Sequence, residues 1–292
     1  VWECPDLFEL PVDGTDRKKW VLICNLNPGG PFGGSATQYF TGDFDGTTFT
    51  PDRDAEGKVP TKWMDFGKDH YATVSFSDAP DSRRTVIGWM SNWQYAAEVP
   101  TRQFRSANTL PRDLRLFTGA DGQLYLASAP SPELDALRAA QVKKAGKTSL
   151  SANPRKYSLP SENDGICEIQ LGLVSRHGAP VTMTLSNAKG EKTVMVYDPK
   201  QHTLSFDRRE SGIVDFSIDF PAVTTAPVLG SDDRLSLRMF IDRSSMEVFG
   251  NDGELVMTNL VFPTEPYTTL TVTAAGKAEM TSLSIWSLNP AK

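Results

Sequence analysis

The stretch Leu235-Ser236-Leu237-Arg238-Met239-Phe240-Ile241 alternates apolar and polar residues over most of its length. Successive side chains of a β-strand point to opposite faces, so a period of two predicts a strand with one buried face. Residues 166–171 and 181–185 show the same alternation. Because such strands bury their apolar faces between two sheets, we expect a β-sandwich over residues 148–292.

Short segments rich in β-branched and aromatic residues also fill the first part of the chain. They lie at residues 19–24, 38–42, 71–76 and 85–90, and turn-forming clusters separate them. This rhythm is typical of a sandwich, a barrel or a propeller, and composition does not choose among them. The predicted fold class is all-β. At residues 251–253, Asn-Asp-Gly predicts a hairpin turn with positive φ.

The pattern becomes helical after residue 130. Ser131 and Pro132 offer an N-cap and a first-turn proline, and leucines follow at helical spacing. We therefore expect a helical linker at residues 131–147. It would join a first domain at residues 1–130 to a second at residues 148–292.

The first residues, Val1-Trp2-Glu3-Cys4-Pro5, surround a carboxylic acid with an aromatic ring, a thiol and a proline. A glutamate that donates a proton at neutral pH needs a partly apolar neighbourhood that raises its pKa. Trp2 and Cys4 could supply one, and Pro5 would fix the local backbone. Taken alone, the motif also fits a strand residue whose carboxylate lies in water.

Residues 2–8 (Trp-Glu-Cys-Pro-Asp-Leu-Phe) resemble the acid/base segment of glycoside hydrolase family 32, the invertases, inulinases and levanases. Further stretches that resemble this family follow in the same order, at residues 38–46, 65–72, 88–96 and 240–249. The resemblance covers nearly the whole chain. It implies that residues 1–130 are the later blades of a five-bladed β-propeller, the partial catalytic domain, followed by a C-terminal β-sandwich.

The chain departs from the family pattern in its other catalytic carboxylates. Family members carry a nucleophilic Asp in a Trp-Met-Asn-Asp-Pro-Asn-like segment and a transition-state-stabilising Asp in an Arg-Asp-Pro segment, both upstream of the acid/base Glu. Residues 89–93 lack the acid of the first motif, and residues 52–55 and 111–114 lack the proline of the second. We therefore expect the C-terminal part of a larger enzyme, with Glu3 as its single catalytic carboxylate.

The resemblance also implies a mechanism. Family members are retaining β-fructofuranosidases, in which Glu3 would protonate the leaving oxygen and later deprotonate a water. The absent Asp would attack the anomeric carbon, so the chain alone is expected to be inactive. Its partners would be a fructan or sucrose and the N-terminal propeller half of the full-length protein, which would be secreted or periplasmic. The sequence does not decide whether the substrate is sucrose, inulin or levan. It also does not decide between exo and endo cleavage, or between hydrolysis and fructosyl transfer.

Four residues are candidates for substrate binding. Trp93 matches the family's aromatic residue that lines the sugar pocket, where an indole can stack on a furanose ring. Asp69 and Tyr71 are placed near the same rim, although a turn-stabilising Asp and a packed Tyr also explain them. Asn92 is placed to bond a sugar hydroxyl, and a role in a turn fits it equally well.

Other polar residues carry less signal. Asp242 and Glu247 flank Arg243, and in the family this segment lies away from the reaction centre, so we expect an arginine–carboxylate network. The three histidines lack metal-ligand spacing, and no glycine-rich phosphate loop opens a helix. No cofactor is predicted.

Composition agrees with a globular protein of one or two domains. The chain has 292 residues, of which 39% are hydrophobic and 23% charged, and no apolar run approaches the length of a membrane-spanning helix. The net charge of −6 argues against a nucleic-acid partner. Three cysteines without close pairs favour free buried thiols and do not identify the compartment.

Two rival interpretations remain beside a proteolysed or truncated enzyme, which we favour. One is a non-catalytic fructan-binding or structural module. The other is an assembled enzyme in which a separate polypeptide supplies the missing blades and the nucleophile. An incomplete propeller would leave an unpaired strand edge for that partner or for aggregation.

Overall fold

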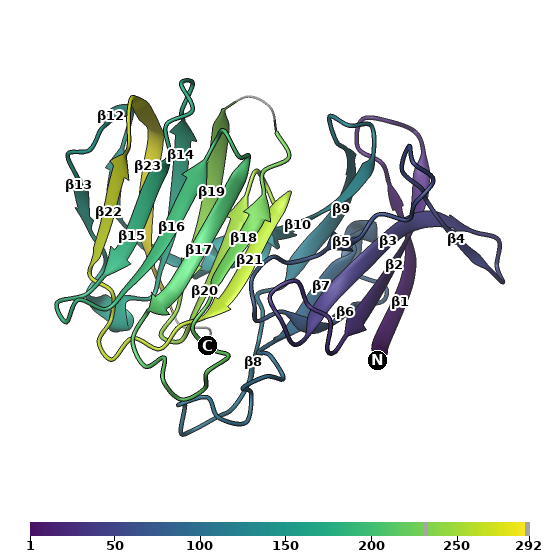
Figure 1. Ribbon diagram of the computed structural model, residues 1–292, viewed down its shortest axis with the longest axis horizontal. Helices are drawn as coiled ribbons and strands as arrows, with labels where there is room; N and C mark the ends of the chain where they lie inside the picture. Colours follow the sequence, from purple (N-terminus) through teal and green to yellow (C-terminus); the bar gives the residue numbers. More distant parts are fainter. Residues whose placement is uncertain (231–232, 290–292) are drawn as a thin grey trace.

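The structure, a computed structural model, describes residues 1–230 and 233–289 (Figure 1). Over these residues the chain forms 23 strands and three short 3₁₀ helices, and the strands make four sheets. The predicted all-β class is confirmed. The described residues form no closed barrel; two sheets belong to the N-terminal half of the chain and two to its C-terminal half.

The N-terminal half contains two antiparallel sheets that share one apolar core. The first sheet has the order β1 (Trp2–Pro11), β2 (Lys18–Leu26), β3 (Ala36–Phe44) and β4 (Phe49–Pro51), with β5 (Lys62–Trp63) paired to β3. The second has the order β10 (Leu124–Pro130), β9 (Arg112–Thr118), β7 (Thr85–Met90) and β6 (Tyr71–Ser75), with β8 (Ala107–Asn108) paired to β7 and η1 (Pro80–Ser82) between β6 and β7. Alternate residues such as Ile23, Val86 and Leu116 meet between the sheets.

The C-terminal half contains two larger sheets packed face to face. One has the order β11 (Arg138–Ala145), β23 (Ala278–Leu288), β14 (Cys167–Val174), β19 (Arg234–Ile241), β20 (Ser245–Gly250) and β21 (Leu255–Leu260), with β12 (Thr148–Leu150) on β23. The other has the order β13 (Arg155–Ser158), β22 (Thr269–Ala274), β15 (Val181–Ser186), β16 (Lys192–Asp198), β17 (Thr203–Glu210) and β18 (Val223–Pro227).

The predicted alternation decides which side chains fill this second core. Leu235, Leu237 and Met239 of β19 are buried against residues of the facing sheet, while Arg238 turns away from the core. The predicted hairpin turn between β20 and β21 is confirmed, because residues 251–253 all have positive φ. Within the described residues, 1–230 and 233–289, no helix is both long and apolar enough to cross a membrane.

The predicted helix is wrong beyond residue 137. A 3₁₀ helix, η2 (Pro132–Leu137), occupies its first turns, and Arg138 then takes extended angles of φ −63° and ψ 124°. The following residues form β11, which pairs with β23 along the edge of the seven-stranded sheet. Backbone pairing with β23 overrides the helix propensity of alanine, glutamine and lysine here. The remaining 3₁₀ helix, η3 (Glu162–Gly165), precedes β14.

Residues 65–69 join the two halves of the chain by covering the edge strand β21. The N–H groups of Phe66 and Asp69 donate to the carbonyls of Val256 and Thr258, at 2.8 and 3.1 Å. Gly67 is needed at this approach, because a Cβ there would lie 2.0 Å from the Thr258 carbonyl oxygen. An edge strand that would otherwise expose unpaired backbone groups is thereby capped by the N-terminal half.

Candidate active site

Glu3 lies near the start of β1, beside a β-bulge. The register of β1 against β2 shifts between Glu3 and Asp6, and Cys4 has a φ of 44°. The side chain of the buried Asn25 fixes this bulge, since its Nδ2 donates to the carbonyls of Cys4 and Thr73, both at 3.2 Å. Bulges turn a side chain away from the ladder direction, and this one presents Glu3 at the surface of the sheet.

The neighbour that distinguishes Glu3 is Tyr71 of β6. The Tyr71 hydroxyl donates a short hydrogen bond to Oε2 of Glu3. Burial, together with this bond to a carboxylate, raises the pKa of Tyr71 above its usual range. The two residues named as catalytic and substrate-binding candidates are therefore in direct contact. Sequence reasoning proposed both but did not predict that they are partners.

The apolar neighbourhood expected from Trp2 and Cys4 is open to solvent. Trp2 is 62% exposed and stacks on Phe40, with ring centroids 5.7 Å apart. Cys4 is exposed as well, whereas Cys24 and Cys167 are buried, and all three thiols are free. The expectation that the free thiols are all buried was wrong for Cys4, because the bulge turns it outward.

A row of aromatic rings leads from Tyr71 to Trp93. Tyr71 and Trp89 pack edge to face with centroids 6.2 Å apart, and the Trp89 and Trp93 centroids are 4.9 Å apart. Trp93 is 58% exposed, so its indole is available to a ligand. Trp89 lies in the same family-like stretch as Trp93, residues 88–96, but the sequence pattern alone did not mark it as a site residue.

Asn92 supports this row from beneath. It is fully buried, and its Nδ2 donates to the Lys68 carbonyl at 2.8 Å while its Oδ1 accepts from the N–H of Gln94 at 3.0 Å. It also bonds the Gly33 carbonyl at 3.2 Å. Asn92 therefore holds the segment that carries Trp93, and a sugar contact from it would require these bonds to exchange.

Asp69 faces the C-terminal half. It is fully buried and accepts hydrogen bonds from the Tyr95 hydroxyl at 2.6 Å, the Leu260 N–H at 2.8 Å and Arg208. The structure thus brings Glu3 and Tyr71 together and links them to Trp93. Asp69 and Asn92 lie behind them, and the substrate-binding roles of all four residues stay predictions.

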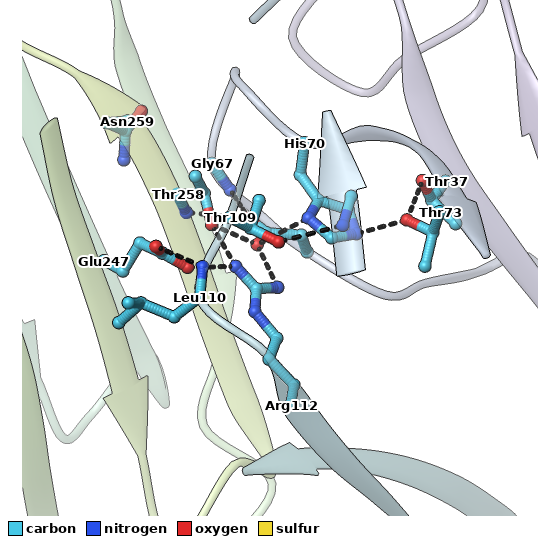
Figure 2. Close-up of polar contacts among 12 residues, drawn as sticks. Thr37, Gly67, His70, Thr73, Thr109, Leu110, Arg112, Glu247, Thr258 and Asn259 are labelled. Atoms are coloured by element: carbon cyan, nitrogen blue, oxygen red, sulfur yellow. Dashed lines mark hydrogen bonds and ion pairs between the residues drawn. The ribbon is translucent and has the colours of Figure 1, made fainter. Parts of the chain in front are cut away.

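A second buried network lies between the halves (Figure 2). Arg112 donates to Asp65 at 2.9 Å and to Glu247 at 2.6 Å, and Glu247 also accepts the Leu110 N–H at 2.8 Å. Burial raises the pKa of Glu247, and Arg112 offsets this only in part. Burial alone would raise the pKa of Asp65, but the charge of Arg112 and hydrogen bonds from Thr258 and Gly67 more than offset it, so that this pKa is lowered.

The arginine–carboxylate network expected around Asp242 and Glu247 has different partners. Glu247 pairs with Arg112, which is 135 residues earlier in the chain, while Arg243 pairs with Asp164. Asp242 accepts the N–H of Arg243 at 2.7 Å. A strand from each half must meet before Arg112 and Glu247 become neighbours, so local sequence carried no signal for this pair.

His70 connects the network to the region below Glu3. Its Nε2 lies 2.6 Å from Oγ1 of Thr73, which lies 3.1 Å from Oγ1 of Thr37 (Figure 2). Thr37 in turn donates to Asn25 at 2.7 Å. Its Nδ1 is 3.7 Å from Oδ2 of Asp65. Burial, reinforced by Arg112, lowers the pKa of His70 to about 3, so the ring is neutral at physiological pH.

This neutral His70 predicts a loss of stability in mild acid. An unfolded histidine takes up a proton near pH 6.5, whereas the folded His70 does not until about pH 3. Because the unfolded state then binds the extra proton, stability falls by about 1.4 kcal/mol per pH unit below pH 6.5. Urea unfolding at pH 7, 6 and 5 measures this, and His70→Gln should flatten the slope by that amount. Exposed His177, changed to Gln, is the control, and an equal slope in both variants would contradict the assignment.

Comparison with known proteins supplies the family. The family model described as the glycosyl hydrolases family 32 N-terminal domain matches residues 1–128, and the model for the family 32 C-terminal region matches residues 133–287. The chain belongs to glycosyl hydrolase family 32. The expected family is therefore shown for both halves of the chain.

The curated relatives include a levanase and an exo-inulinase. The chain is 41% identical over 298 residues to a levanase of Bacillus subtilis, covering 99% of this chain and 43% of that protein. It is 37% identical over 277 residues to an extracellular exo-inulinase of Aspergillus ficuum, covering 90% of this chain and 50% of that protein. The chain thus spans about half the length of the curated relatives it matches.

Two solved structures have a similar fold. The exo-inulinase of Aspergillus awamori superposes with a TM-score of 0.89 at 32% identity, covering 99% of this chain and 57% of that chain. A variant of the fructofuranosidase of Schwanniomyces occidentalis, in complex with fructosylnystose, gives a TM-score of 0.86 at 28% identity, with 99% and 60% covered.

The described part of the chain contains no cluster of side chains suited to bind a metal ion. Across residues 1–230 and 233–289, no group of three or more histidine, cysteine, aspartate or glutamate side chains is arranged to hold a metal ion.

Proposed function

We propose that this chain is part of a retaining β-fructofuranosidase in which Glu3 is the acid/base residue. The observation that carries this is the contact between Glu3 and Tyr71 at a surface bulge, which the ring of Trp89 links to the exposed indole of Trp93. The motif around Glu3 resembles the acid/base segment of family 32, and the chain belongs to that family. A proton donor on the first sheet and a stacking surface for a sugar beside the second sheet are thus linked by the rings of Tyr71 and Trp89.

Tyr71 orients the Glu3 carboxyl group for proton transfer. Its hydrogen bond occupies Oε2 and leaves Oε1 available to the substrate. In the first step, the glycosidic C2–O bond breaks, Glu3 gives its proton to the departing oxygen, and a carboxylate nucleophile bonds C2. In the second step, Glu3 takes a proton from water, whose oxygen displaces the nucleophile with overall retention.

The nucleophile and the stabilising carboxylate are proposed to come from outside these 292 residues. Neither family motif for those two acids occurs in the sequence. Retaining glycosidases place the two reacting carboxyl groups about 5–5.5 Å apart. We infer that the two N-terminal sheets are later blades of a five-bladed propeller, that the C-terminal sheets form a β-sandwich, and that a further N-terminal segment supplies the remaining blades. The chain alone would then be inactive.

The proposed substrate class is a terminal β-fructosyl unit of a fructan or of sucrose. Relatives named levanase and exo-inulinase support fructans, as does the complex of a related fructofuranosidase with fructosylnystose. The exposed face of Trp93 can stack on a furanose ring. Tyr71 would contact the same ring beside Glu3, and Asp69 and Asn92 would shape the rim from behind.

The stereochemistry of the product tests this function. The chain is combined with an N-terminal segment that carries a family-type nucleophilic Asp, and we call this combination the assembled protein. Proton NMR during hydrolysis of inulin should first show β-fructofuranose, which only later equilibrates with its other forms. Initial release of the α-anomer would contradict a retaining mechanism, and absence of any fructose would favour a non-catalytic fructan-binding module.

A further inference from the structure

Two segments that form the candidate site also reach the C-terminal half. One carries Tyr71 and begins at Asp69, and the other carries Trp93 and continues to Tyr95. Asp69 and Tyr95 are both fully buried or nearly so, at 0% and 1% exposure. A single side chain of the C-terminal half, Arg208 of β17, contacts both of them.

The hydrogen bonds of Arg208 use four of its five N–H groups. Nη1 donates to Oδ2 of Asp69 at 2.5 Å and to the Leu260 carbonyl at 3.1 Å. Nη2 donates to the Tyr95 hydroxyl at 2.7 Å, and Nε donates to the Phe220 carbonyl at 2.8 Å. The guanidinium also lies 3.9 Å from the centroid of the Phe220 ring. These four hydrogen bonds and the ring contact together fix the orientation of the guanidinium.

A closed triangle results at the base of the two segments. The Tyr95 hydroxyl donates to Oδ1 of Asp69 at 2.6 Å while it accepts from Arg208. Asp69, Tyr95 and Arg208 therefore each contact the other two. Only a planar fork can bond a carboxylate, a phenol and two carbonyls at once, whereas a lysine ammonium is a point donor. The triangle sets the distance between the segment that carries Tyr71 and the segment that carries Trp93.

Stability alone does not account for this charged triangle. Apolar side chains already pack around it, among them Met90, Val99, Leu260 and Phe262. Replacing a buried ion pair by well-packed apolar residues is often neutral or stabilising, because taking charges out of water is costly. What the triangle adds is directional geometry between two segments, one just before β6 and the other after β7.

We propose that Arg208 is a positioning residue of the candidate active site, which acts from the C-terminal half through Asp69 and Tyr95. This inference rests on the proposed function for its meaning in catalysis. The C-terminal half would then be part of the catalytic machinery and not merely an attached domain. Arg208 holds the Tyr71–Glu3 pair at a fixed distance from the indole of Trp93 without touching any of these three side chains.

Fluorine NMR of the chain tests this without any need for activity. The protein is labelled with 3-fluorotyrosine, which gives one resonance for each of its seven tyrosines, and Tyr71→Phe assigns that of Tyr71. Arg208→Lys should move or broaden the Tyr71 resonance in the folded protein, although Arg208 does not contact Tyr71. The control is Arg209→Lys, because exposed Arg209 bonds Asp207 on its own strand. It should leave the Tyr71 resonance in place.

The assembled protein supplies a kinetic readout. Because a misplacement of about 1 Å can reduce catalysis about 10²-fold, Arg208→Lys should lower kcat/KM by about 10–10²-fold, mostly through kcat, and Arg209→Lys should not. If Arg208→Lys does not fold, Tyr95→Phe removes one corner of the triangle and is judged by the same two measurements. A Tyr71 resonance that stays in place, or that moves equally in Arg209→Lys, would overturn the positioning role. Failure of the proposed function is distinguishable, because Glu3→Gln would then retain full activity whatever Arg208→Lys does.

Discussion

Replacing Glu3 by Gln in the assembled protein is expected to lower kcat on inulin by about 10²–10⁴-fold, the usual contribution of general acid–base catalysis. Glutamine keeps the size of the side chain and can still accept the Tyr71 hydrogen bond at its amide oxygen. It cannot give a proton to the departing sugar oxygen. Steady-state release of fructose measures the loss, and KM should change much less than kcat.

The matched control for this change is Glu9→Gln on the same strand. Glu9 is exposed and lies 3.6 Å from Lys18 at the surface, so the same substitution there should leave kcat unchanged. With a substrate whose leaving group is strongly acidic, the rate of glycosidic bond cleavage in the Glu3→Gln protein should return most of the way to that of the unchanged protein. Such a group departs without protonation. Equal activity of the Glu3→Gln and Glu9→Gln proteins would exclude Glu3 as the acid/base residue.

Replacing Arg112 by Met is expected to destabilise the chain by about 3–5 kcal/mol, the largest stability effect that the contacts predict. Arg112 is fully buried, and its removal would leave the buried carboxyl groups of Asp65 and Glu247 close together without the cation that both pair with. Asp65 belongs to the N-terminal half and Glu247 to the C-terminal half. Repulsion between their carboxylates would therefore also weaken the contact between the halves. Urea unfolding at pH 7, followed by far-ultraviolet circular dichroism, measures this loss.

Arg115→Met on the same strand is the control for the arginine. Arg115 is 30% exposed and pairs with Asp13 at 2.7 Å, and exposed pairs of this kind contribute about 0–1 kcal/mol. The account requires a large difference between the two variants. If both unfold at the same urea concentration, the buried network does not hold the halves together.

The sequence predicted most of the strands because one period governs both pattern and burial. In β19 the apolar residues of the alternation fill the core, so the pattern and the structure agree residue by residue. The stretch after Leu137 has no such alternation and carries good helix formers, yet it forms β11. Its conformation depends on β23, which lies more than 130 residues later. A local pattern contains no information about that partner.

The candidate site divides in the same way. The motif around Glu3 and the exposed Trp93 could be proposed from sequence, since each resembles a family segment. The hydrogen bond between Glu3 and Tyr71 could not, because it requires β1 and β6 to lie side by side. Asp69 and Asn92 were assigned to the rim from their neighbours in sequence, whereas the structure places both beneath it. Adjacent residues of an irregular segment point in different directions, which a motif does not specify.

The central claim is that Glu3 is the one catalytic carboxylate of this chain, and fructose release tests it most directly. The purified 292-residue chain, with its intact mass confirmed, is given sucrose, inulin and levan, alone and as the assembled protein. We predict no release by the chain alone, and release by the assembled protein that Glu3→Gln lowers by about 10²–10⁴-fold. Release by the chain alone, lost in Glu3→Gln, would contradict the claim, because a second carboxylate within these residues would then be the nucleophile.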